Sequence, residues 1–196
     1  ITNDSGDIRL IQKPVEELNK LRQKKINYKD LIIDGSKTLE GVKGTSFEFK
    51  AELSWEDADQ FGLKVRKSSN EETIIGYDVV NKEIYVDRSY AGLSTLVDRN
   101  GNDFQFGRKY TAPLVSSNKT VTIHGYIDES SIELFVNDGE RVLTNLIYPK
   151  PTSNSIELFS ENGKTTLNNF TFYPMKSVWR KNSENKPSRL VVDEKS

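Results

Sequence analysis

The chain has 196 residues, of which 35% are apolar and 29% charged, and this length suits one folded domain with its own core. Lys and Arg (28) nearly balance Asp and Glu (29), so no basic field is available for nucleic acid or for an acidic membrane surface. There is no cysteine and only one histidine, His124, which excludes disulfides, thiolate catalysis and histidine-rich metal sites. We therefore expect no cofactor and no metal, and no apolar run approaches membrane-spanning length.

Residues 1–27 are predicted to be a connector. Val15, Leu18 and Leu21 lie at helical spacing after Pro14, a residue that suits the first position of a helix. The helix can only be short. The chain begins without an initiator methionine or a signal-peptide pattern, so we expect it to be an internal part of a longer protein.

Residues 28–175 are predicted to form strands. "SFEFKAEL" alternates with Phe47, Phe49, Ala51 and Leu53 on one face, and "FGLKVRKS" has the same pattern. "ETIIGYDVVNKEIYVDRS" predicts a hairpin around Asn81-Lys82, and "RNGND", "NDGE", "KPTSN" and "ENGK" are turn signals between further strands. Many short strands predict an all-β fold, either an antiparallel sandwich or a barrel. Strands with a single apolar face, such as "SFEFKAEL", favour the antiparallel β-sandwich, of the concanavalin or laminin-G jelly-roll type.

Residues 176–196 lose the alternation and are predicted to be a polar C-terminal tail. Trp179 is expected to fix the start of this tail to the domain, and the last dozen residues are polar.

The segment "TVTIHGYIDESSIELFVN" predicts a hairpin with Glu129-Ser130 at its tip. In that register Tyr126 lies opposite Glu133 and His124 lies opposite Phe135. One face is then apolar and forms the core. The opposite face carries rings beside a carboxylate and an amide; its residues are Thr122, His124, Tyr126, Glu133, Phe135 and Asn137.

Two interpretations of this second face are open. Rings beside polar groups suit a sugar, whose C–H faces pack on aromatic rings and whose hydroxyls need fixed donors and acceptors. Aromatic cross-strand pairs also stabilise sheets without any ligand, and a neighbouring domain can cover such a face.

Other polar residues have mainly structural interpretations. Arg88 falls on the same side as Ile75 and Val86, which favours a partly buried ion-pair partner over a ligand contact. Arg108 is either an interface or a surface residue, and His124 fits a packed sheet residue better than a catalytic base. "NDGE" is a tight turn, since a calcium loop needs a longer run of oxygen ligands.

Catalytic motifs are absent from the sequence. We find no pair of carboxylates in a pocket-forming motif, no glycine-rich phosphate loop and no nucleophile elbow. The chain alone is predicted not to be an enzyme.

Four segments in order, "RLIQKPVEELNKLR", "YVDRSYAG", "GRKYTAPL" and "IDESSIELFVNDGERVLTNLIYP", resemble the C-terminal β-sandwich of glycoside hydrolase family 32 and the connector before it. That family contains levanases, inulinases, invertases and sucrose-6-phosphate hydrolases. The resemblance implies that the catalytic acids lie in an N-terminal propeller absent from this chain. It also implies a catalytic propeller of the same polypeptide as a partner, and an extracellular enzyme, with a cytoplasmic one as the alternative; the composition favours a bacterial source.

The sandwich is also similar to a family 66 carbohydrate-binding module, which implies binding of the terminal fructose of levan or another fructan. The alternative is a structural domain that stabilises the propeller or mediates dimerisation. For sugar binding we expect acids and arginines on the fructose hydroxyls and a ring against the sugar face. The candidate residues are Asp87, Arg88, Arg108, Tyr126, Asp128 and Glu133.

Overall fold

The computed structural model describes residues 10–177, and nearly all of its regular structure is β-strand. The two helices are short 3-10 turns, η1 (Glu16–Leu21) and η2 (Asn137–Gly139). The strands are β1 (Ile26–Lys43), β2 (Phe47–Trp55), β3 (Gln60–Lys67), β4 (Glu72–Asp78), β5 (Glu83–Tyr90), β6 (Thr95–Val97), β7 (Asp103–Gln105), β8 (Lys109–Pro113), β9 (Thr120–Ile127), β10 (Ser131–Val136), β11 (Arg141–Leu146) and β12 (Ser155–Pro174).

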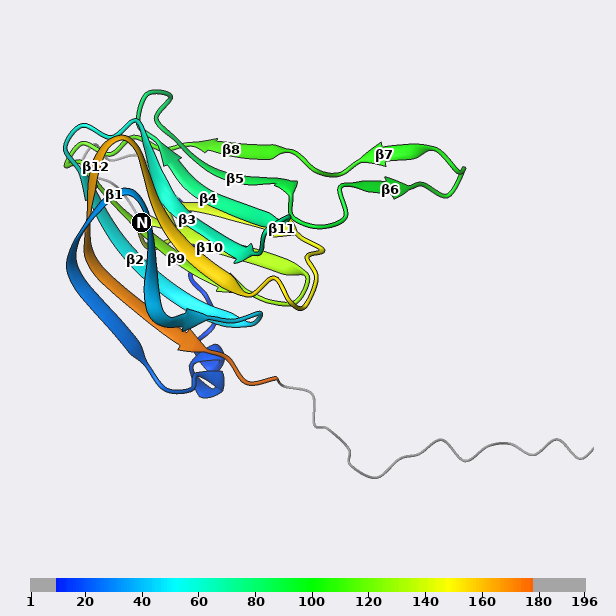
Figure 1. The fold of residues 1–196 in the computed structure, drawn as a ribbon, viewed down its shortest axis with the longest axis horizontal. Helices are drawn as coiled ribbons and strands as arrows, with labels where there is room; N and C mark the ends of the chain where they lie inside the picture. Colours follow the sequence, from blue (N-terminus) through cyan, green and yellow to red (C-terminus); the bar gives the residue numbers. More distant parts are fainter. Residues whose placement is uncertain (1–9, 178–196) are drawn as a thin grey trace, which may run out of the picture.

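The strands form two antiparallel layers that share one long strand, as Figure 1 shows. Hydrogen bonding is continuous through one sheet of order β11-β10-β9-β2-β12-β3-β4-β5-β8, with β1 beside β12 and β6-β7 as a separate pair. We call the layer β11-β10-β9-β2-β12 the first sheet and the layer β12-β3-β4-β5-β8 the second sheet. Residues 165–174 of β12 pair with β2, whereas residues 155–161 pair with β3, so β12 passes from one sheet into the other. The long strand β1 lies beside β12 along most of its length. The predicted all-β antiparallel sandwich is confirmed.

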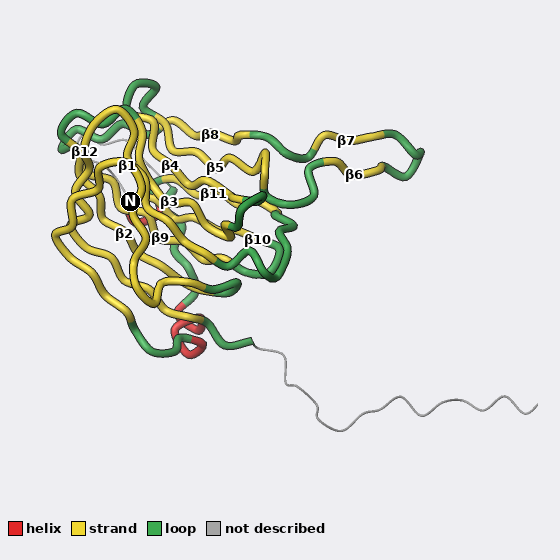
Figure 2. The backbone as a smooth tube through the Cα atoms, viewed as in Figure 1, coloured by secondary structure: helices red, strands yellow, loops and turns green. Residues whose placement is uncertain are grey.

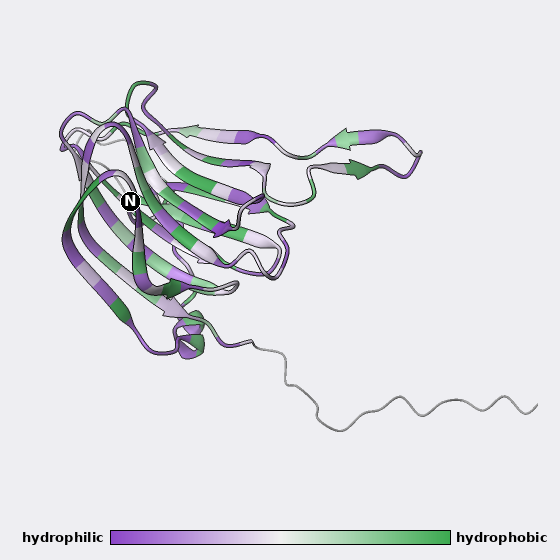
Figure 3. Ribbon diagram, viewed as in Figure 1, coloured by the Kyte–Doolittle hydropathy of each residue, from purple (hydrophilic) through white to green (hydrophobic). Residues whose placement is uncertain are grey.

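The core lies between the two sheets and follows the alternation read from the sequence. Figure 3 shows apolar and polar residues alternating along the strands. The apolar positions of β2 are buried, and their rings pack against those of β12: Phe47 lies 5.2 Å from Phe172, and Phe49 lies 6.3 Å from Phe170, between ring centroids. This aromatic cluster joins the strands at the centre of the first sheet.

The prediction of a chain reversal at "ENGK" is wrong. Residues 161–164 lie inside the continuous strand β12, where Asn162 adopts a φ of 54° and the strand bends without turning back. One local and one distant hydrogen bond hold the bend: Ser160 Oγ donates to the Gly163 carbonyl at 2.7 Å, and Lys164 N donates to Asp57 Oδ1, on the β2–β3 loop, at 2.9 Å. Pairing with β2 beyond the bend and with β3 before it keeps the chain extended, so tertiary pairing overrides the local turn signal.

The other turn signals are confirmed. Asn81-Lys82 lies in the turn between β4 and β5, where Asp78 pairs with Glu83. "NDGE" forms the tight turn η2 before β11. "RNGND" closes the β6–β7 hairpin, which projects from the sandwich as an arm in Figures 1 and 2.

Candidate functional site

The β9–β10 hairpin has the predicted register. Glu133 pairs with Tyr126, and Phe135 pairs with His124. The alternate residues Ile123, Ile132 and Leu134 are fully buried in the core. The ring-bearing face therefore points away from the core, on the outer side of the first sheet.

Glu48, which the sequence analysis did not single out, lies at the centre of this face. It stands on β2 opposite Tyr126, and only 1% of its surface is exposed. Arg22 binds its carboxylate in a bidentate pair, from Nε to Oε2 at 2.5 Å and from Nη2 to Oε1 at 2.6 Å. His124 Nε2 lies 2.8 Å from Oε1; because an ionised carboxylate only accepts, Nε2 carries the proton.

The protonation of Glu48 is fixed by these partners. Burial alone would raise its pKa, but the hydrogen bonds from His124 and Arg22, together with their charges, lower the pKa to about 2. The pKa of Arg22 is raised by its hydrogen bond with Glu48. Burial, and then the charge of Glu48, raises the pKa of Tyr126 to about 12. The buried carboxylate of Glu48 is therefore ionised at neutral pH.

The segment before β1 covers this face. From here on, the word connector refers to residues 10–25, the described part of the predicted connector that precedes β1. Its start is tied to η2 by a hydrogen bond from Gln12 N to the Gly139 carbonyl at 3.3 Å, and its end is tied to the end of β12 by a bond from Gln23 N to the Pro174 carbonyl at 2.9 Å. The guanidinium of Arg22 also lies 4.7 Å from the ring centroid of Tyr173. The connector therefore crosses the outer face of the first sheet between two anchored ends.

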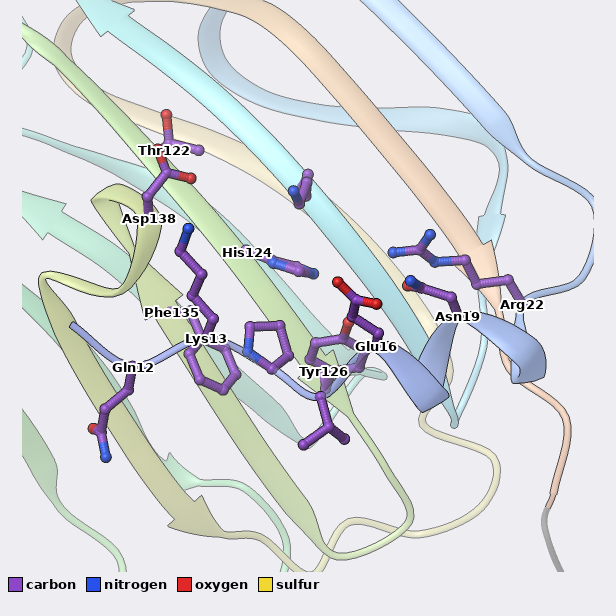
Figure 4. Close-up of a pocket in the computed structure, with 13 residues that line it drawn as sticks. Gln12, Lys13, Glu16, Asn19, Arg22, Thr122, His124, Tyr126, Phe135 and Asp138 are labelled. Carbon is purple, nitrogen blue, oxygen red and sulfur yellow. The ribbon is translucent and has the colours of Figure 1, made fainter.

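A pocket of about 260 Å³ remains between the connector and the sheet (Figure 4). Its floor is formed by three rings of the β9–β10 hairpin, and its walls come from the connector, β2 and η2. The lining residues are Gln12, Lys13, Pro14, Val15, Glu16, Asn19, Arg22, Lys50, Thr122, His124, Tyr126, Phe135 and Asp138.

Of the six residues predicted to bind sugar, only Tyr126 lines this pocket. Glu133 is its exposed cross-strand neighbour. Asp128 stands at the hairpin turn, where its Oδ1 accepts from Glu129 N at 2.8 Å. Asp87 and Arg88 lie on β5 and Arg108 immediately precedes β8, on the second sheet, so the six residues do not converge on one site.

Arg88 makes ring contacts in place of the ion pair that was predicted. It is 4% exposed, its guanidinium carbon lies 3.0 Å from the ring centroid of Phe106, and its Nη2 has no hydrogen-bond partner. Within residues 10–177 no carboxylate pairs with it. The ion-pair prediction is wrong because the aromatic side chains that follow the β6–β7 arm fill this space.

Arg108 and Asp87 have local partners near Arg88. Arg108 is exposed, and its Nε donates to the hydroxyl of Tyr110 at 2.8 Å. Asp87 Oδ1 accepts from Ser89 N at 2.9 Å. Because neighbouring residues of a strand point to opposite faces, Asp87 and Arg88 do not share one site.

Residues 10–177 contain neither a cluster of metal ligands nor a membrane-spanning helix. No three His, Asp or Glu side chains in this part of the chain come close enough to hold a metal ion. No helix in it is both long and apolar enough to cross a membrane.

Comparison with known proteins identifies the family. Residues 17–174 match the family model of the C-terminal domain of glycosyl hydrolases family 32. The chain is 37% identical over 176 residues to a levanase of Bacillus subtilis, covering 88% of this chain and 25% of that protein. It is 30% identical over 146 residues to an extracellular exo-inulinase of Aspergillus awamori, covering 71% of this chain and 26% of that protein.

The solved structures agree. The crystal structure of the exo-inulinase from Aspergillus awamori superposes with a TM-score of 0.71 at 27% identity, covering 89% of this chain and 34% of that chain. The fructan 1-exohydrolase IIa of Cichorium intybus has the same fold, with a TM-score of 0.67 at 20% identity over 89% of this chain and 39% of that chain. The present chain thus spans about a quarter of the length of these curated relatives, and it belongs to the family of C-terminal domains of family 32 glycosyl hydrolases.

Proposed function

We propose that this chain is the non-catalytic C-terminal domain of an extracellular fructan-cleaving hydrolase. In this proposal the sandwich holds the segment that joins it to the catalytic domain. The relatives named as levanases and inulinases support the substrate class, and the name of the Aspergillus enzyme supports the extracellular location. The small share of those relatives that this chain covers supports a separate catalytic domain in the same polypeptide.

The observation that carries this proposal is the anchoring of the connector by a buried charge. Arg22 of the connector binds Glu48 of β2, and His124 of β9 binds the same carboxylate. Removing one partner of a buried charge pair is costly because the other charge stays behind without compensation. The connector is therefore fixed to the sheet, and a domain attached before it would be held at a defined position.

A substitution at Gly139 tests whether the connector is docked. Gly139 has a φ of +94°, and a Cβ there would lie 1.8 Å from the Gln12 carbonyl oxygen. Gly139→Ala is therefore expected to push the connector off the sheet and to lower the free energy of unfolding by about 1–2 kcal/mol. Trypsin should then cleave after Lys20 and Arg22 at least tenfold faster than in the wild type.

Gly101→Ala is the matched control. Gly101 has a similar φ of +85°, but nothing lies within 4 Å of a Cβ placed there. This variant carries the same backbone strain without a collision, so cleavage of the connector should stay at the wild-type rate. Rapid cleavage in the wild type as well as in both alanine variants would show that the connector is not held in place, and the proposed role would be lost.

A carbohydrate-binding role is the second candidate, and the observation that favours it is the pocket with three rings in its floor. Calorimetric titration of the chain with levan oligosaccharides and with a glucan separates the two roles. Heat with levan and none with the glucan supports sugar binding. Absence of heat with both leaves the anchoring role alone.

A further inference from the structure

We infer that the β6–β7 arm joins two copies of this chain into a two-fold symmetric dimer. In this dimer β7 of each copy pairs antiparallel with β7 of the other, and the two hairpins form one four-stranded sheet. The inference rests on the backbone and the side chains of the arm, and it depends neither on the connector nor on a sugar ligand.

The arm stands apart from the rest of the domain. Among residues 10–177, β6 pairs only with β7, and neither strand belongs to the large sheet. Figures 1 and 2 show the arm pointing away from the sandwich. A two-stranded hairpin is marginally stable on its own in water, whereas three or more strands with an apolar face are stable. An arm that projects in this way therefore gains stability from strands of another molecule.

The hydrogen bonds within the arm show which backbone groups of β7 face β6. Phe106 N donates to the Ser94 carbonyl at 2.7 Å, and Asp98 N donates to the Asn102 carbonyl at 2.8 Å. Hydrogen-bonded positions alternate along an antiparallel pair. Phe104 lies midway between these two pairs, so its backbone N–H and C=O groups also face β6.

The backbone N–H and C=O groups of Asp103 and Gln105 therefore point outward. When two copies of β7 lie antiparallel with Phe104 on the two-fold axis, Asp103 of one copy is opposite Gln105 of the other. This pair exchanges two hydrogen bonds and the symmetry repeats them, so the edge is complementary to itself. The edge also lacks the lysine, proline or bulge that blocks many free edges, whereas the edge strand β8 carries Lys109 and Pro113.

The side chains of the arm favour the same pairing. Phe104 is 50% exposed, and its position on the axis is a non-hydrogen-bonded one, where the side chains of two paired strands come closest. The two Phe104 rings then meet at the centre of the four-stranded sheet, beside Leu96 of each copy. Val97 near the tip is 69% exposed and Leu93 at the base is 54% exposed. Antiparallel overlap brings the tip of one arm to the base of the other and covers both.

The charges at the tip and at the base of the arm are complementary. The tip carries Asp98, Arg99 and Asp103, and the base continues into Arg108 and Lys109. Antiparallel overlap places each acidic tip beside the basic base of the partner, which steers the two copies into this orientation. The contact is small and belongs to the weak class, with a Kd on the order of 100 μM.

A second copy fits this arm better than the domain that is proposed to precede the connector. The connector starts beside η2, where Gln12 N bonds the Gly139 carbonyl, just before β11. The arm leaves the sandwich beside the other end of β11, where Leu93 N donates to the Tyr148 carbonyl at 3.4 Å. A domain attached before the connector therefore enters at the opposite end of β11 from the arm.

Single cysteines map the two-fold axis, because the chain has no cysteine of its own. Phe104→Cys places two thiols opposite each other across the axis, within reach of a disulfide. Asn100→Cys is the control, since Asn100 is exposed at the tip of the same arm and the two tips lie at opposite ends of the sheet. At about twice the expected Kd, Phe104→Cys should form a covalent dimer about tenfold faster on a non-reducing gel than Asn100→Cys.

Sedimentation equilibrium of the chain measures the dimer itself. Phe104→Ser should weaken association about tenfold, whereas Ile32→Ser, which removes a 62% exposed apolar side chain from β1, should leave the Kd unchanged. Asp103→Arg and Arg108→Asp should each weaken association about fivefold. The double variant should recover most of the loss, because the opposite charges meet between the two copies.

Three outcomes would overturn the inference. The first is a chain that stays monomeric at tenfold the expected Kd and cross-links equally in both cysteine variants. The second is faster cross-linking of Asn100→Cys, which would place the two tips together. The third is a dimer that survives Phe104→Ser and is lost in Ile32→Ser. Gly139→Ala should leave the dimer unchanged, so failure of the arm contact and failure of the anchoring role are distinguishable.

Discussion

Replacing Arg66 by methionine is expected to lower the free energy of unfolding by about 3–5 kcal/mol, because several buried carbonyl groups lose their donor at once. Arg66 is fully buried at the end of β3, and its guanidinium donates only to backbone carbonyl oxygens from three loops. The acceptors are the carbonyls of Ser153 at 2.9 Å, Asp128 at 3.1 Å, Thr45 at 3.2 Å, Glu129 at 3.3 Å and Lys150 at 3.3 Å. Methionine fills the space but leaves these carbonyls without donors, and each buried unpaired group has its own cost.

Urea unfolding at pH 7 measures this loss, and Arg99→Met is the control. Arg99 lies exposed in the turn of the β6–β7 arm, so its replacement should change the free energy of unfolding by less than about 0.5 kcal/mol. A loss of less than about 1 kcal/mol in Arg66→Met would show that the three loops are held together by other contacts. One such contact is Glu71 Oε2, which accepts from Lys150 N at 2.9 Å and from Ser153 Oγ at 2.5 Å.

The elements that could be predicted are those governed by short-range periodicity. Side chains of a strand alternate with a period of two, so the apolar positions of β2 and β3 identify the core face without knowledge of the partner strands. The β9–β10 register follows from the same rule once the turn at Glu129-Ser130 is fixed, because slipping by one residue would expose Ile132 and Leu134.

The residues that could not be predicted depend on contacts between distant segments. Arg66 and Glu48 both stand next to apolar neighbours on strands and look like solvent-facing positions. Arg66 is buried by loops that lie more than 20 residues from it in sequence, and Glu48 is buried by Arg22, 26 residues away. The only sequence signal of this buried carboxylate was the single histidine, His124, opposite Phe135. The N–H group of a histidine on a ring-bearing face needs a hydrogen-bond acceptor, and Glu48 supplies it.

The candidate site could be predicted only in part, for the same reason. The ring-bearing face with Thr122, His124, Tyr126 and Phe135 was identified, but the pocket exists only because the connector crosses that face. The connector was recognised as a short helical segment, and nothing in its own periodicity indicates where it lies. The prediction of Asp87, Arg88 and Arg108 as sugar ligands stays a prediction, with Arg88 stacked on Phe106 in the other sheet.

The Glu48 carboxylate should make part of the stability of this domain dependent on acid pH. Its pKa is lowered from 4.5 to about 2 in the folded protein, so the folded state holds the charged form more strongly than the unfolded chain does. The resulting stabilisation, about 3 kcal/mol, is fully present above pH 4.5 and is lost as the pH falls from 4.5 towards 2. Glu48→Gln should therefore be less stable than the wild type by about this amount at pH 7.

Urea unfolding of both proteins at pH 7, 4.5, 3 and 2 follows this change, with Glu52→Gln as the control. Glu52 is exposed on the same face of β2 and lacks the pair with Arg22 and His124, so its replacement should have little effect at any of these pH values. The difference between wild type and Glu48→Gln should shrink across the acid range because the wild type progressively protonates the same carboxylate. A difference that stayed constant down to pH 2 would mean that Arg22 and His124 do not lower the pKa of Glu48. The connector would then be held by packing against the rings and not by the buried charge.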